Sequence, residues 1–227
     1  MIDGQAIPKN SDDHLPNFFP CSRMVKAPSL VSVMLNSTVA ITDLFKRGTA
    51  SDILSIADYL TVPDFALLAP QAPGNSWYPT SFLAPPAQNE PWLSNSLKLL
   101  ANLVESVKEQ GIKPEQIYFL GFSQGACLTL EYIARNATRY GGVVAFTGGL
   151  VGDKIYPEKY TGSLADTPIF IDTSDPDPHV PVERVLASAQ LLKNMGAIVT
   201  EKIYPNKPHT ISQDEIDTAN TLIFSQS

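Results

Sequence analysis

Short runs of apolar and β-branched residues alternate with amphipathic stretches along the chain from Leu30 onward. Runs of this length predict buried strands, whereas apolar residues that recur every three or four positions predict one face of a helix. We expect strands at residues 31–35, 65–69, 117–120, 143–147, 169–173 and 199–204. Strands that alternate with helices usually form a mostly parallel sheet covered by helices on both faces. The pattern therefore predicts an α/β fold.

Helices are predicted between several of these strands. The clearest lies at residues 97–107, where the apolar positions fall on one face and Gly111 follows as a natural end. Residues 182–195 repeat the arrangement, with Gly196 after them. Ser212 predicts the cap of a last helix that continues to about residue 224.

Two segments depart from the alternation. Residues 1–29 are polar, contain several prolines and show no period, so we expect an irregular lead-in or an edge hairpin, followed by a single domain over residues 30–227. Residues 71–92 are rich in proline and aromatic side chains. Because long segments without secondary structure are uncommon inside compact domains, we expect this one to be a functional excursion over the sheet.

The composition fits one domain of this size. The chain has 227 residues, of which 44% are hydrophobic, and this is enough to bury a substantial core. It carries 23 acidic and 16 basic residues for a net charge of −7, and the basic residues form no cluster that could neutralise a run of phosphates. Nucleic acid is therefore not an expected partner.

The cysteines and the apolar runs bear on cofactors and location. Cys21 and Cys127 lie far apart and suggest neither a disulfide framework nor a metal-binding pattern. No apolar stretch approaches the roughly 18 residues that span a bilayer, and the N-terminus lacks the basic and apolar segments of a secretory signal. We expect a cytoplasmic protein without stable membrane insertion, and we expect no metal and no cofactor.

The clearest chemical signal is the pentapeptide Gly121-Phe122-Ser123-Gln124-Gly125, which follows a predicted strand and precedes a helix-forming stretch. A nucleophilic serine must stand exposed on a sharp turn at the end of a strand, and glycines two residues to either side relieve the crowding there. The arrangement predicts a nucleophile elbow with Ser123 as the nucleophile. The alternative interpretation is a glycine-rich turn with an idle serine.

A serine hydroxyl is a weak nucleophile at neutral pH and needs a base within hydrogen-bond reach, which a carboxylate orients. The chain has three histidines, and His14 precedes the sheet altogether. His209 lies in the loop between the last predicted strand and the last predicted helix, where enzymes with the order Ser, acid, His carry the base. His179 follows Asp177 too closely for easy orientation by it, and we interpret it as a residue of the pocket rim or of the entry to the next helix.

The acid is expected in the loop after the strand at residues 169–173, a region that offers three aspartates. Asp172 is still within the predicted strand, and Asp175 follows it closely. Asp177 lies between two prolines, in a stiff turn that is suited to holding a carboxylate against an imidazole. We therefore choose Asp177 as the acid and keep Asp175 as the alternative.

Attack on a carbonyl creates an oxyanion, which preorganised backbone donors must stabilise. One donor is the N–H of the residue after the nucleophile, here Gln124, at the start of a helix whose N-terminus also favours negative charge. The second donor is expected from the loop after an early strand.

These motifs together resemble the phospholipase/carboxylesterase family of α/β-hydrolases, which includes the acyl-protein thioesterases. The resemblance covers most of the chain from Arg47 onward. The matching strings are Leu68-Ala69-Pro70-Gln71-Ala72, Asn75-Ser76-Trp77-Tyr78-Pro79, Gly121-Phe122-Ser123-Gln124-Gly125-Ala126, Gly148-Gly149-Leu150, Asp177-Pro178-His179-Val180-Pro181 and the stretch around His209.

The resemblance implies an α/β-hydrolase fold in which Ser123, Asp177 and His209 form the catalytic triad. It also implies that Trp77, together with Tyr78, belongs to the acyl-binding wall beside the active site. Without the family, the two aromatic residues could equally belong to the core of a proline-rich flap.

The chain departs from the family pattern after the first predicted strand. Family members run from that strand into Leu-His-Gly-x-Gly, a loop whose backbone presents the second oxyanion donor. Here an apolar segment at residues 36–46 stands in place of the His-Gly pair, and the pattern resumes at Arg47, which would align with the donor residue. Loss of one such donor typically lowers kcat about 10²- to 10³-fold.

The sequence thus predicts a serine hydrolase that cleaves carboxylic esters or thioesters through an acyl-enzyme intermediate. Its partners would be small-molecule or lipid acyl esters or acylated proteins, and an apolar rim around the site would suit a homodimer. Because residues 36–46 are altered, one alternative is a hydrolase-shaped protein that binds an acyl ligand or partner with negligible turnover. Another is a dienelactone-type hydrolase, but these typically use a cysteine nucleophile, and Cys127 lies beyond Ser123 in the predicted helix.

Overall fold

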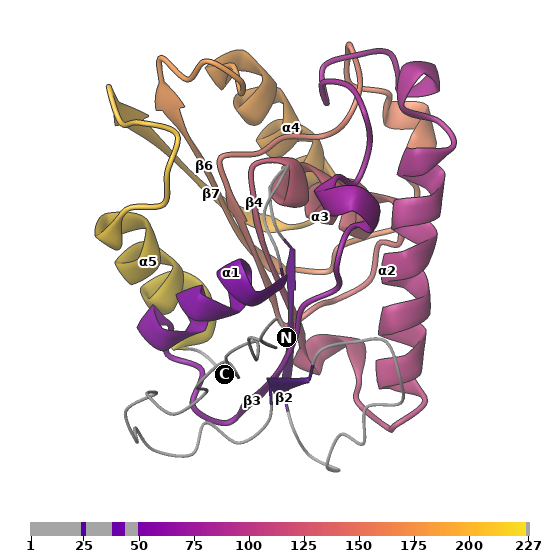
Figure 1. Ribbon diagram of the computed structural model, residues 1–227, viewed down its shortest axis with the longest axis vertical. Coiled ribbons are helices and arrows are strands. Elements are labelled where there is room, and N and C mark those ends of the chain that lie inside the picture. The colour runs from indigo at the N-terminus through magenta and orange to yellow at the C-terminus, as the bar shows by residue number, and fades with distance from the viewer. Residues whose placement is uncertain (1–23, 26–37, 44–49, 226–227) are drawn as a thin grey trace, which may run out of the picture.

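The computed structural model describes residues 24–25, 38–43 and 50–225 (Figure 1). Within these residues, seven strands form one sheet in the order β1-β3-β2-β4-β5-β6-β7, and all neighbouring pairs are parallel. The strands are β1 (Met24–Val25), β2 (Thr38–Asp43), β3 (Phe65–Leu68), β4 (Ile117–Phe122), β5 (Gly142–Phe146), β6 (Pro168–Asp175) and β7 (Ile198–Pro205).

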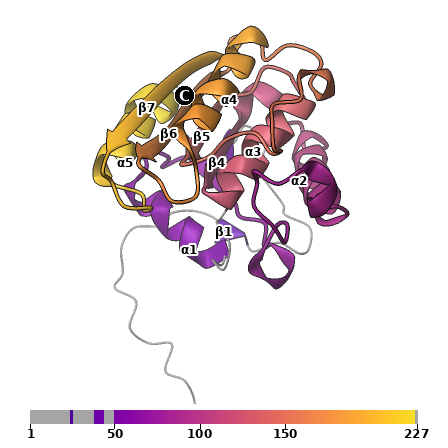
Figure 2. The same cartoon turned by 90° about the horizontal axis from the view of Figure 1, so that it is seen from above.

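Helices cover both faces of this sheet (Figures 1 and 2). They are α1 (Ala50–Leu54), α2 (Trp92–Lys108), α3 (Gln124–Arg135), α4 (Val182–Asn194) and α5 (Gln213–Ala219), which continues as a π-helical turn, Asn220–Phe224. Helices α1 and α5 lie on one face, and α2, α3 and α4 lie on the other. The predicted α/β fold with a parallel central sheet is confirmed. No helix in the described part of the chain is long and apolar enough to cross a membrane.

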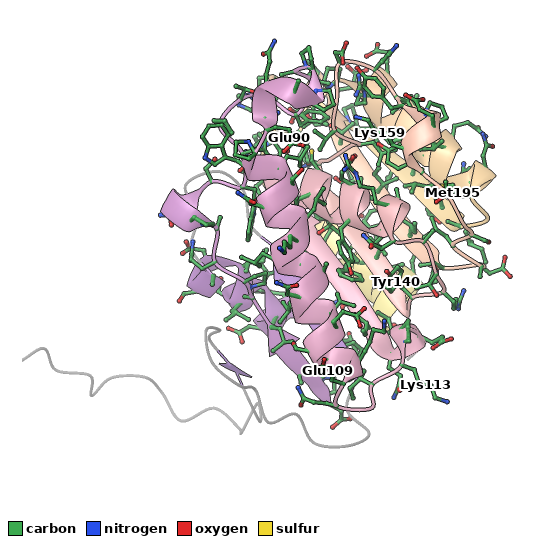
Figure 3. The ribbon with its side chains drawn as sticks, turned by 90° about the vertical axis from the view of Figure 1, so that its right-hand side faces the viewer. Glu90, Glu109, Lys113, Tyr140, Lys159 and Met195 are labelled. Carbon is green, nitrogen blue, oxygen red and sulfur yellow. The ribbon has the colours of Figure 1, made fainter. Side chains whose placement is uncertain are left out.

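A separate hydrophobic core fills each face. On one face, α2, α3 and α4 bury residues such as Leu100 and Ile133 against the sheet. Figure 3 shows α2 running along this face, with Glu109 at its carboxyl end. On the other face, α1, α5 and the π-helical turn bury Ile53, Ile216 and Ile223. Strands β4 and β5 are buried along their whole length because they contribute side chains to both cores.

Most predicted strands appear within a few residues of the expected positions. The predicted strands at 65–69, 117–120, 143–147, 169–173 and 199–204 correspond to β3, β4, β5, β6 and β7. The predicted strand at residues 31–35 lies outside the described residues. Of the lead-in, for which an irregular segment or an edge hairpin was expected, Met24–Val25 form β1, paired with β3 at the edge of the sheet. The rest of residues 1–29 lies outside the described part.

One prediction near the nucleophile strand is wrong. Residues 36–46 were expected to be a rebuilt loop after the first strand, but Thr38–Asp43 form strand β2 inside the sheet. This strand pairs with β3 on one side and with β4 on the other, and Asp43 is opposite Gly121. The short apolar run Val39-Ala40-Ile41 is typical of a central strand of a parallel sheet. Residues 44–49 lie outside the described residues. They include Arg47, which was expected to be an oxyanion donor.

Candidate active site

Ser123 occupies a sharp turn between β4 and α3. Its φ is +54°, a conformation that residues other than glycine rarely adopt. Its N–H donates to the carbonyl of Phe146 at the end of β5 at 2.9 Å, and its carbonyl accepts from the N–H of Cys127 at 3.0 Å. The neighbouring strand and the first turn of the helix therefore hold the turn in shape, as expected for a nucleophile elbow.

Small residues allow α3 to approach the strand ends closely. A Cβ on Gly121 would lie 2.6 Å from the backbone nitrogen of Ala126 and 2.6 Å from the carbonyl carbon of Gly125. A Cβ on Gly148, just beyond β5, would lie 2.5 Å from the Cβ of Ala126. The crowding that the sequence predicted at Gly121 is therefore present.

Three side chains that are far apart in the sequence form one hydrogen-bonded chain. Nε2 of His209 lies 2.9 Å from Oγ of Ser123, and Nδ1 of His209 lies 2.8 Å from Oδ2 of Asp177. The residues follow β4, β6 and β7, and the carboxyl ends of parallel strands meet at one edge of a sheet. The side chain of His209 is 19% exposed, whereas that of Asp177 is fully buried.

The environment of Asp177 favours its carboxylate form. Burial by itself raises the pKa of this carboxyl, but its hydrogen bond with His209 and those from the backbone N–H groups of His179 and Val180 outweigh that effect. Oδ1 accepts both backbone bonds, each at 2.8 Å. The pKa of Asp177 is consequently below its usual value, so Oδ2 can accept a hydrogen bond from protonated Nδ1 of His209.

The other candidates for acid and base have different surroundings. Asp172 is fully buried in β6 and accepts a hydrogen bond from the N–H of Thr147, and Asp175 is the exposed last residue of that strand. His179 is exposed, and its ring lies nearly perpendicular to that of His209, with the centroids 5.1 Å apart. It lines the cleft, which is the pocket-rim position predicted for it.

Gln124 contributes to the site with both backbone and side chain. As the first residue of α3, its N–H has no partner within the helix and is free to face a developing oxyanion. Its side-chain Oε1 accepts a hydrogen bond from the N–H of Trp77 at 2.9 Å, and its Nε2 donates to the carbonyl of Tyr78 at 2.9 Å. Gln124 thereby fixes the segment that leads into the wall of the cleft.

The two predicted wall aromatics have separate positions. Tyr78 lines the cleft. Trp77 is 2% exposed and packs in the core under α2, where the hydroxyl of Ser96 donates to its carbonyl at 2.8 Å. Trp77 is therefore in the core and is not among the residues that line the cleft, so its part in an acyl-binding wall stays a prediction.

A cleft of about 620 Å³ opens beside Ser123 and His209. Its walls and floor are formed by residues 78–83, residues 178–180, and Ser123 with Gln124 and Cys127. Burial raises the pKa of the Cys127 thiol to about 12, so this group is a neutral part of the surface and not a nucleophile. Among the described residues, no group of histidine, cysteine or acidic side chains is arranged to hold a metal ion.

Sequence reasoning did not identify the remainder of this wall. Thr80, Ser81, Phe82 and Leu83 line the cleft, although only the whole excursion at residues 71–92 was expected to be functional. Its proline and aromatic content was the available signal. Which residues of such a segment face the cleft depends on contacts with distant residues, such as Gln124, that local patterns do not reveal.

The sequence and the structure are similar to those of known esterases and thioesterases. Residues 66–225 match the sequence pattern of the phospholipase/carboxylesterase family. A phospholipase/carboxylesterase from Dyadobacter fermentans, known from its crystal structure, is 49% identical, with a TM-score of 0.82 over 83% of this chain and 91% of that one.

Curated relatives include two proteins named acyl-protein thioesterase 1. The one from Gibberella zeae is 32% identical over 58% of this chain and 57% of its own length. The one from Saccharomyces cerevisiae is 33% identical over 57% of this chain and 58% of its own length. The chain thus spans somewhat more than half the length of these two relatives.

Proposed function

Because the chain belongs to the phospholipase/carboxylesterase family of α/β-hydrolases, we propose that it hydrolyses carboxylic esters or thioesters with Ser123 as the nucleophile. The observation that carries this proposal is the hydrogen-bonded chain from Ser123 through His209 to Asp177 at the edge of an open cleft. A nucleophile, a base and an orienting acid in this order are the arrangement that acyl transfer requires.

Acylation begins when Oγ of Ser123 attacks the carbonyl carbon of the substrate. Nε2 of His209 takes the hydroxyl proton as the new bond forms, and the carboxylate of Asp177 stabilises the imidazolium that results. The carbonyl oxygen becomes an oxyanion, to which the N–H of Gln124 donates a hydrogen bond. The N-terminus of α3 adds a favourable electrostatic contribution at the same place.

The tetrahedral intermediate then collapses. The bond from the carbonyl carbon to the leaving oxygen or sulfur breaks, and His209 returns its proton to the leaving alcohol or thiol. Water subsequently attacks the acyl-enzyme with His209 again as the base, and release of the acid regenerates Ser123. The proposed cycle needs neither a metal nor an organic cofactor.

The walls of the cleft suit an acyl chain. Tyr78, Phe82, Leu83 and Val180 supply apolar surface beside the nucleophile, and burial of each CH₂ group contributes about 0.8 kcal/mol. We therefore include lipid esters, small esters and protein thioesters among the proposed substrates. The names of the fungal relatives support protein thioesters.

Hydrolysis of p-nitrophenyl esters from acetate to laurate tests the proposal, with the wild type and Ser123→Ala assayed in parallel. We expect turnover by the wild type only, and the preferred chain length then measures the usable depth of the cleft. A fluorophosphonate should label the wild type and leave Ser123→Ala unlabelled. If both proteins hydrolyse every ester at the background rate, the hydrolase proposal fails, and the acyl-binding alternative from the sequence becomes the better account.

A further inference from the structure

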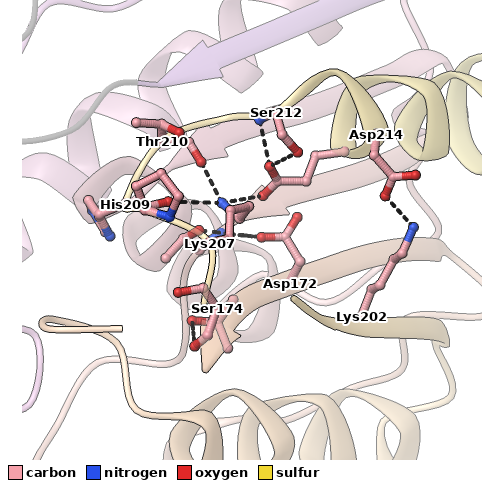
Figure 4. Close-up of polar contacts among 12 residues, drawn as sticks. Asp172, Ser174, Lys202, Lys207, His209, Thr210, Ser212 and Asp214 are labelled. Carbon is pink, nitrogen blue, oxygen red and sulfur yellow. Dashed lines mark hydrogen bonds and ion pairs between the residues drawn. The ribbon is translucent and has the colours of Figure 1, made fainter. Parts of the chain in front are cut away.

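A buried polar cluster lies beneath the loop that carries His209 (Figure 4). It consists of Asp172 on β6, Lys207 in the loop after β7, and Glu215 on α5. Asp172 and Glu215 are fully buried, and the side chain of Lys207 is only 10% exposed. None of the three lines the cleft, so substrate contact does not explain why ionisable groups are buried there.

Lys207 connects both sides of His209 to the last helix. Its ammonium group donates to the carbonyls of Pro208 and Thr210, the residues directly before and after His209. The same Nζ lies 3.0 Å from Oε1 of Glu215. A single, largely buried cation therefore holds the backbone on either side of the imidazole against α5.

Glu215 in turn anchors the end of this loop. Its Oε2 accepts hydrogen bonds from the backbone N–H and the hydroxyl of Ser212, both at 2.6 Å, and forms a capping box at the start of α5. The two oxygens of Glu215 are thus divided between the helix cap and Lys207. The loop is consequently bonded to Glu215 of α5 through the ammonium group of Lys207 and through the N–H and hydroxyl of Ser212.

Asp172 connects the cluster to the nucleophile. Its Oδ1 accepts the N–H of Thr147 at 2.8 Å, and Thr147 has a left-handed φ of +53°. Thr147 directly follows Phe146, whose carbonyl accepts the N–H of Ser123. The cluster therefore contacts both the loop of His209 and the strand end that holds the elbow.

The second oxygen of Asp172, Oδ2, is buried and has no hydrogen-bond donor among the described residues. The neighbouring carboxyl group is that of Glu215, and two carboxyl oxygens can share a hydrogen bond only if one of them carries a proton. Burial, followed by the charge of Glu215, raises the pKa of Asp172 well above its usual value. Protonated Asp172 can donate to Glu215, whose negative charge Lys207 balances.

We propose that Asp172, Glu215 and Lys207 are positioning residues that hold His209 at hydrogen-bond distance from Ser123, with one proton retained between the two carboxyl groups. The inference rests on the proposed function, because it takes His209 as the base. It adds a buried pair of acids, Asp172 and Glu215, to the site. Asp177 is separate from this pair and contacts the imidazole directly.

The cluster has a characteristic pH dependence. Among the described residues, the titratable groups that interact with Asp172 are Glu215 of α5, Lys207 of the histidine loop and Tyr204 of β7. A carboxyl whose pKa is raised in the folded state stabilises the fold fully below its unfolded pKa, about 3.9. That contribution decreases as the pH rises through the folded pKa. At high pH, two buried carboxylates would face one ammonium group, and the loop should loosen.

Two variants separate positioning from chemistry. Lys207→Met removes the cation but keeps the length of the side chain, and we expect kcat for p-nitrophenyl acetate to decrease roughly 10- to 100-fold, because small displacements of a catalytic group have effects of this size. KM should change little, since Lys207 lies outside the cleft. Lys207→Arg should restore part of the loss. Lys202→Met is the matched control. Lys202 on β7 forms an exposed ion pair with Asp214, which lies on α5 next to Glu215, and loss of this pair should leave kcat unchanged (Figure 4).

Asp172→Asn tests the proton. An asparagine keeps an acceptor for Thr147 and offers an N–H to Glu215, but it cannot ionise. We expect nearly wild-type kcat at neutral pH, and both kcat and the free energy of unfolding should decrease less steeply toward alkaline pH than in the wild type. Unchanged kcat in Lys207→Met, or alkaline pH profiles in Asp172→Asn identical to those of the wild type, would overturn the inference.

The unfolding measurement does not depend on turnover, so it separates failure of this inference from failure of the proposed function. If wild type and Ser123→Ala both hydrolyse esters at background, the function is wrong, and the role of the cluster in stability can still be read. If only the wild type turns over and the Lys207 and Asp172 variants behave like Lys202→Met, the hydrolase stands and the positioning role is rejected.

Discussion

At Ser123 the backbone adopts a conformation that typically costs about 1–3 kcal/mol for a residue other than glycine. Hydrogen bonds from its N–H to Phe146 and from Cys127 to its carbonyl offset this strain. The turn brings Oγ to the cleft, where Nε2 of His209 contacts it. Because β5 and α3 supply the supporting bonds, a change that separates these elements should displace Ser123.

Gly121→Ala should disable the elbow. The added Cβ would lie 2.6 Å from backbone atoms of Gly125 and Ala126. These atoms belong to the first turn of α3, so the start of the helix would have to shift to relieve the clash. We expect the free energy of unfolding to decrease by about 1–3 kcal/mol and kcat to decrease on the order of 10²-fold. Thermal unfolding and hydrolysis of p-nitrophenyl acetate measure the two effects.

Gly74→Ala is the control for that variant. Gly74 has a φ of +62°, and no atom lies within 4 Å of a Cβ built there. Alanine should therefore cost only about 1 kcal/mol through its backbone conformation and leave kcat unchanged. Equal effects of the two substitutions would show that close approach of α3 is not what requires glycine at position 121.

Asp177→Asn should lower kcat about 10⁴-fold, because an amide neither stabilises the imidazolium nor selects the productive tautomer of His209. The variant should also change the dependence of stability on pH. Although burial acts in the opposite direction, hydrogen bonds lower the pKa of Asp177. Its carboxylate therefore stabilises the fold above the unfolded pKa, about 3.9, and this contribution disappears as the pH falls through the folded pKa.

Urea unfolding between neutral and acidic pH measures this effect. The free energy of unfolding should decrease less steeply below about pH 4 in Asp177→Asn than in the wild type. Asp58→Asn, at an exposed position in the 3-10 turn Ser55–Tyr59, should behave like the wild type in both stability and kcat. An Asp177→Asn variant with the activity of Asp58→Asn would remove Asp177 from the proposed mechanism.

At the scale of elements, one buried side chain holds the cleft wall at residues 78–83. Oδ1 of Asn89 accepts the N–H of Thr80 at 3.0 Å and its hydroxyl at 2.7 Å. Nδ2 donates to the carbonyl of Ser81 at 3.0 Å. Asn89 is fully buried, so no solvent can replace these bonds without entering the protein.

Asn89→Ala should loosen this wall and leave the chemistry intact. Unsatisfied groups of the loop should destabilise the protein by about 1–3 kcal/mol. KM for medium-chain p-nitrophenyl esters should rise, while turnover of the acetate changes little, because Asn89 does not contact the triad. Gln88→Ala, at the exposed neighbouring position, is the control. A chain-length profile of Asn89→Ala that equals that of Gln88→Ala would contradict this role of the wall.

Strands β4 and β6 could be predicted because their apolar runs, Ile117-Tyr118-Phe119-Leu120 and Ile169-Phe170-Ile171, are followed by turn-forming residues. Strand β2 escaped prediction, since its apolar core is only Val39-Ala40-Ile41 and polar residues flank it. The sheet contacts of β3 and β4 decide its structure, and local sequence does not encode them. The helix predicted from Ser212 was found with that residue as its cap, because a capping box is a local interaction.

The candidate site was predictable where chemistry restricts the choice of residue. A serine on an elbow and few histidines left little choice for nucleophile and base. Whether an aromatic residue such as Trp77 packs in the core or lines the cleft depends on distant hydrogen bonds, which the local sequence does not reveal. Asp172 offered a signal that was interpreted only as a weaker acid candidate, namely an aspartate directly after the apolar run Ile169-Phe170-Ile171.

On the scale of the whole molecule, one sheet separates two cores and belongs to both. Leu100 lies in the core under α2, and Ile223 lies in the core under α5 and the π-helical turn. Both are almost completely buried, and a Cβ at Gly142 would meet Cγ2 of Ile223 at 2.5 Å. Because β4 and β5 contact both cores, the loss of one face should destabilise the other.

Leu100→Ala and Ile223→Ala should therefore each cost about 2–5 kcal/mol and should each lower the midpoint of a single unfolding transition. Near-ultraviolet circular dichroism, which senses buried aromatic residues such as Trp77, and far-ultraviolet circular dichroism, which senses backbone structure, should give coincident curves. Separate transitions in either variant would show that the two faces unfold independently.

The wall at residues 78–83 and the proposed triad come from different parts of the chain. The wall belongs to the connection between β3 and α2, whereas Ser123, Asp177 and His209 follow β4, β6 and β7. Substitutions in that connection can reshape the cleft without moving the strand ends that carry the reacting groups. The proposed selectivity for the acyl group can therefore be redesigned by exchange of this one short segment, while the proposed triad keeps its place at the strand ends.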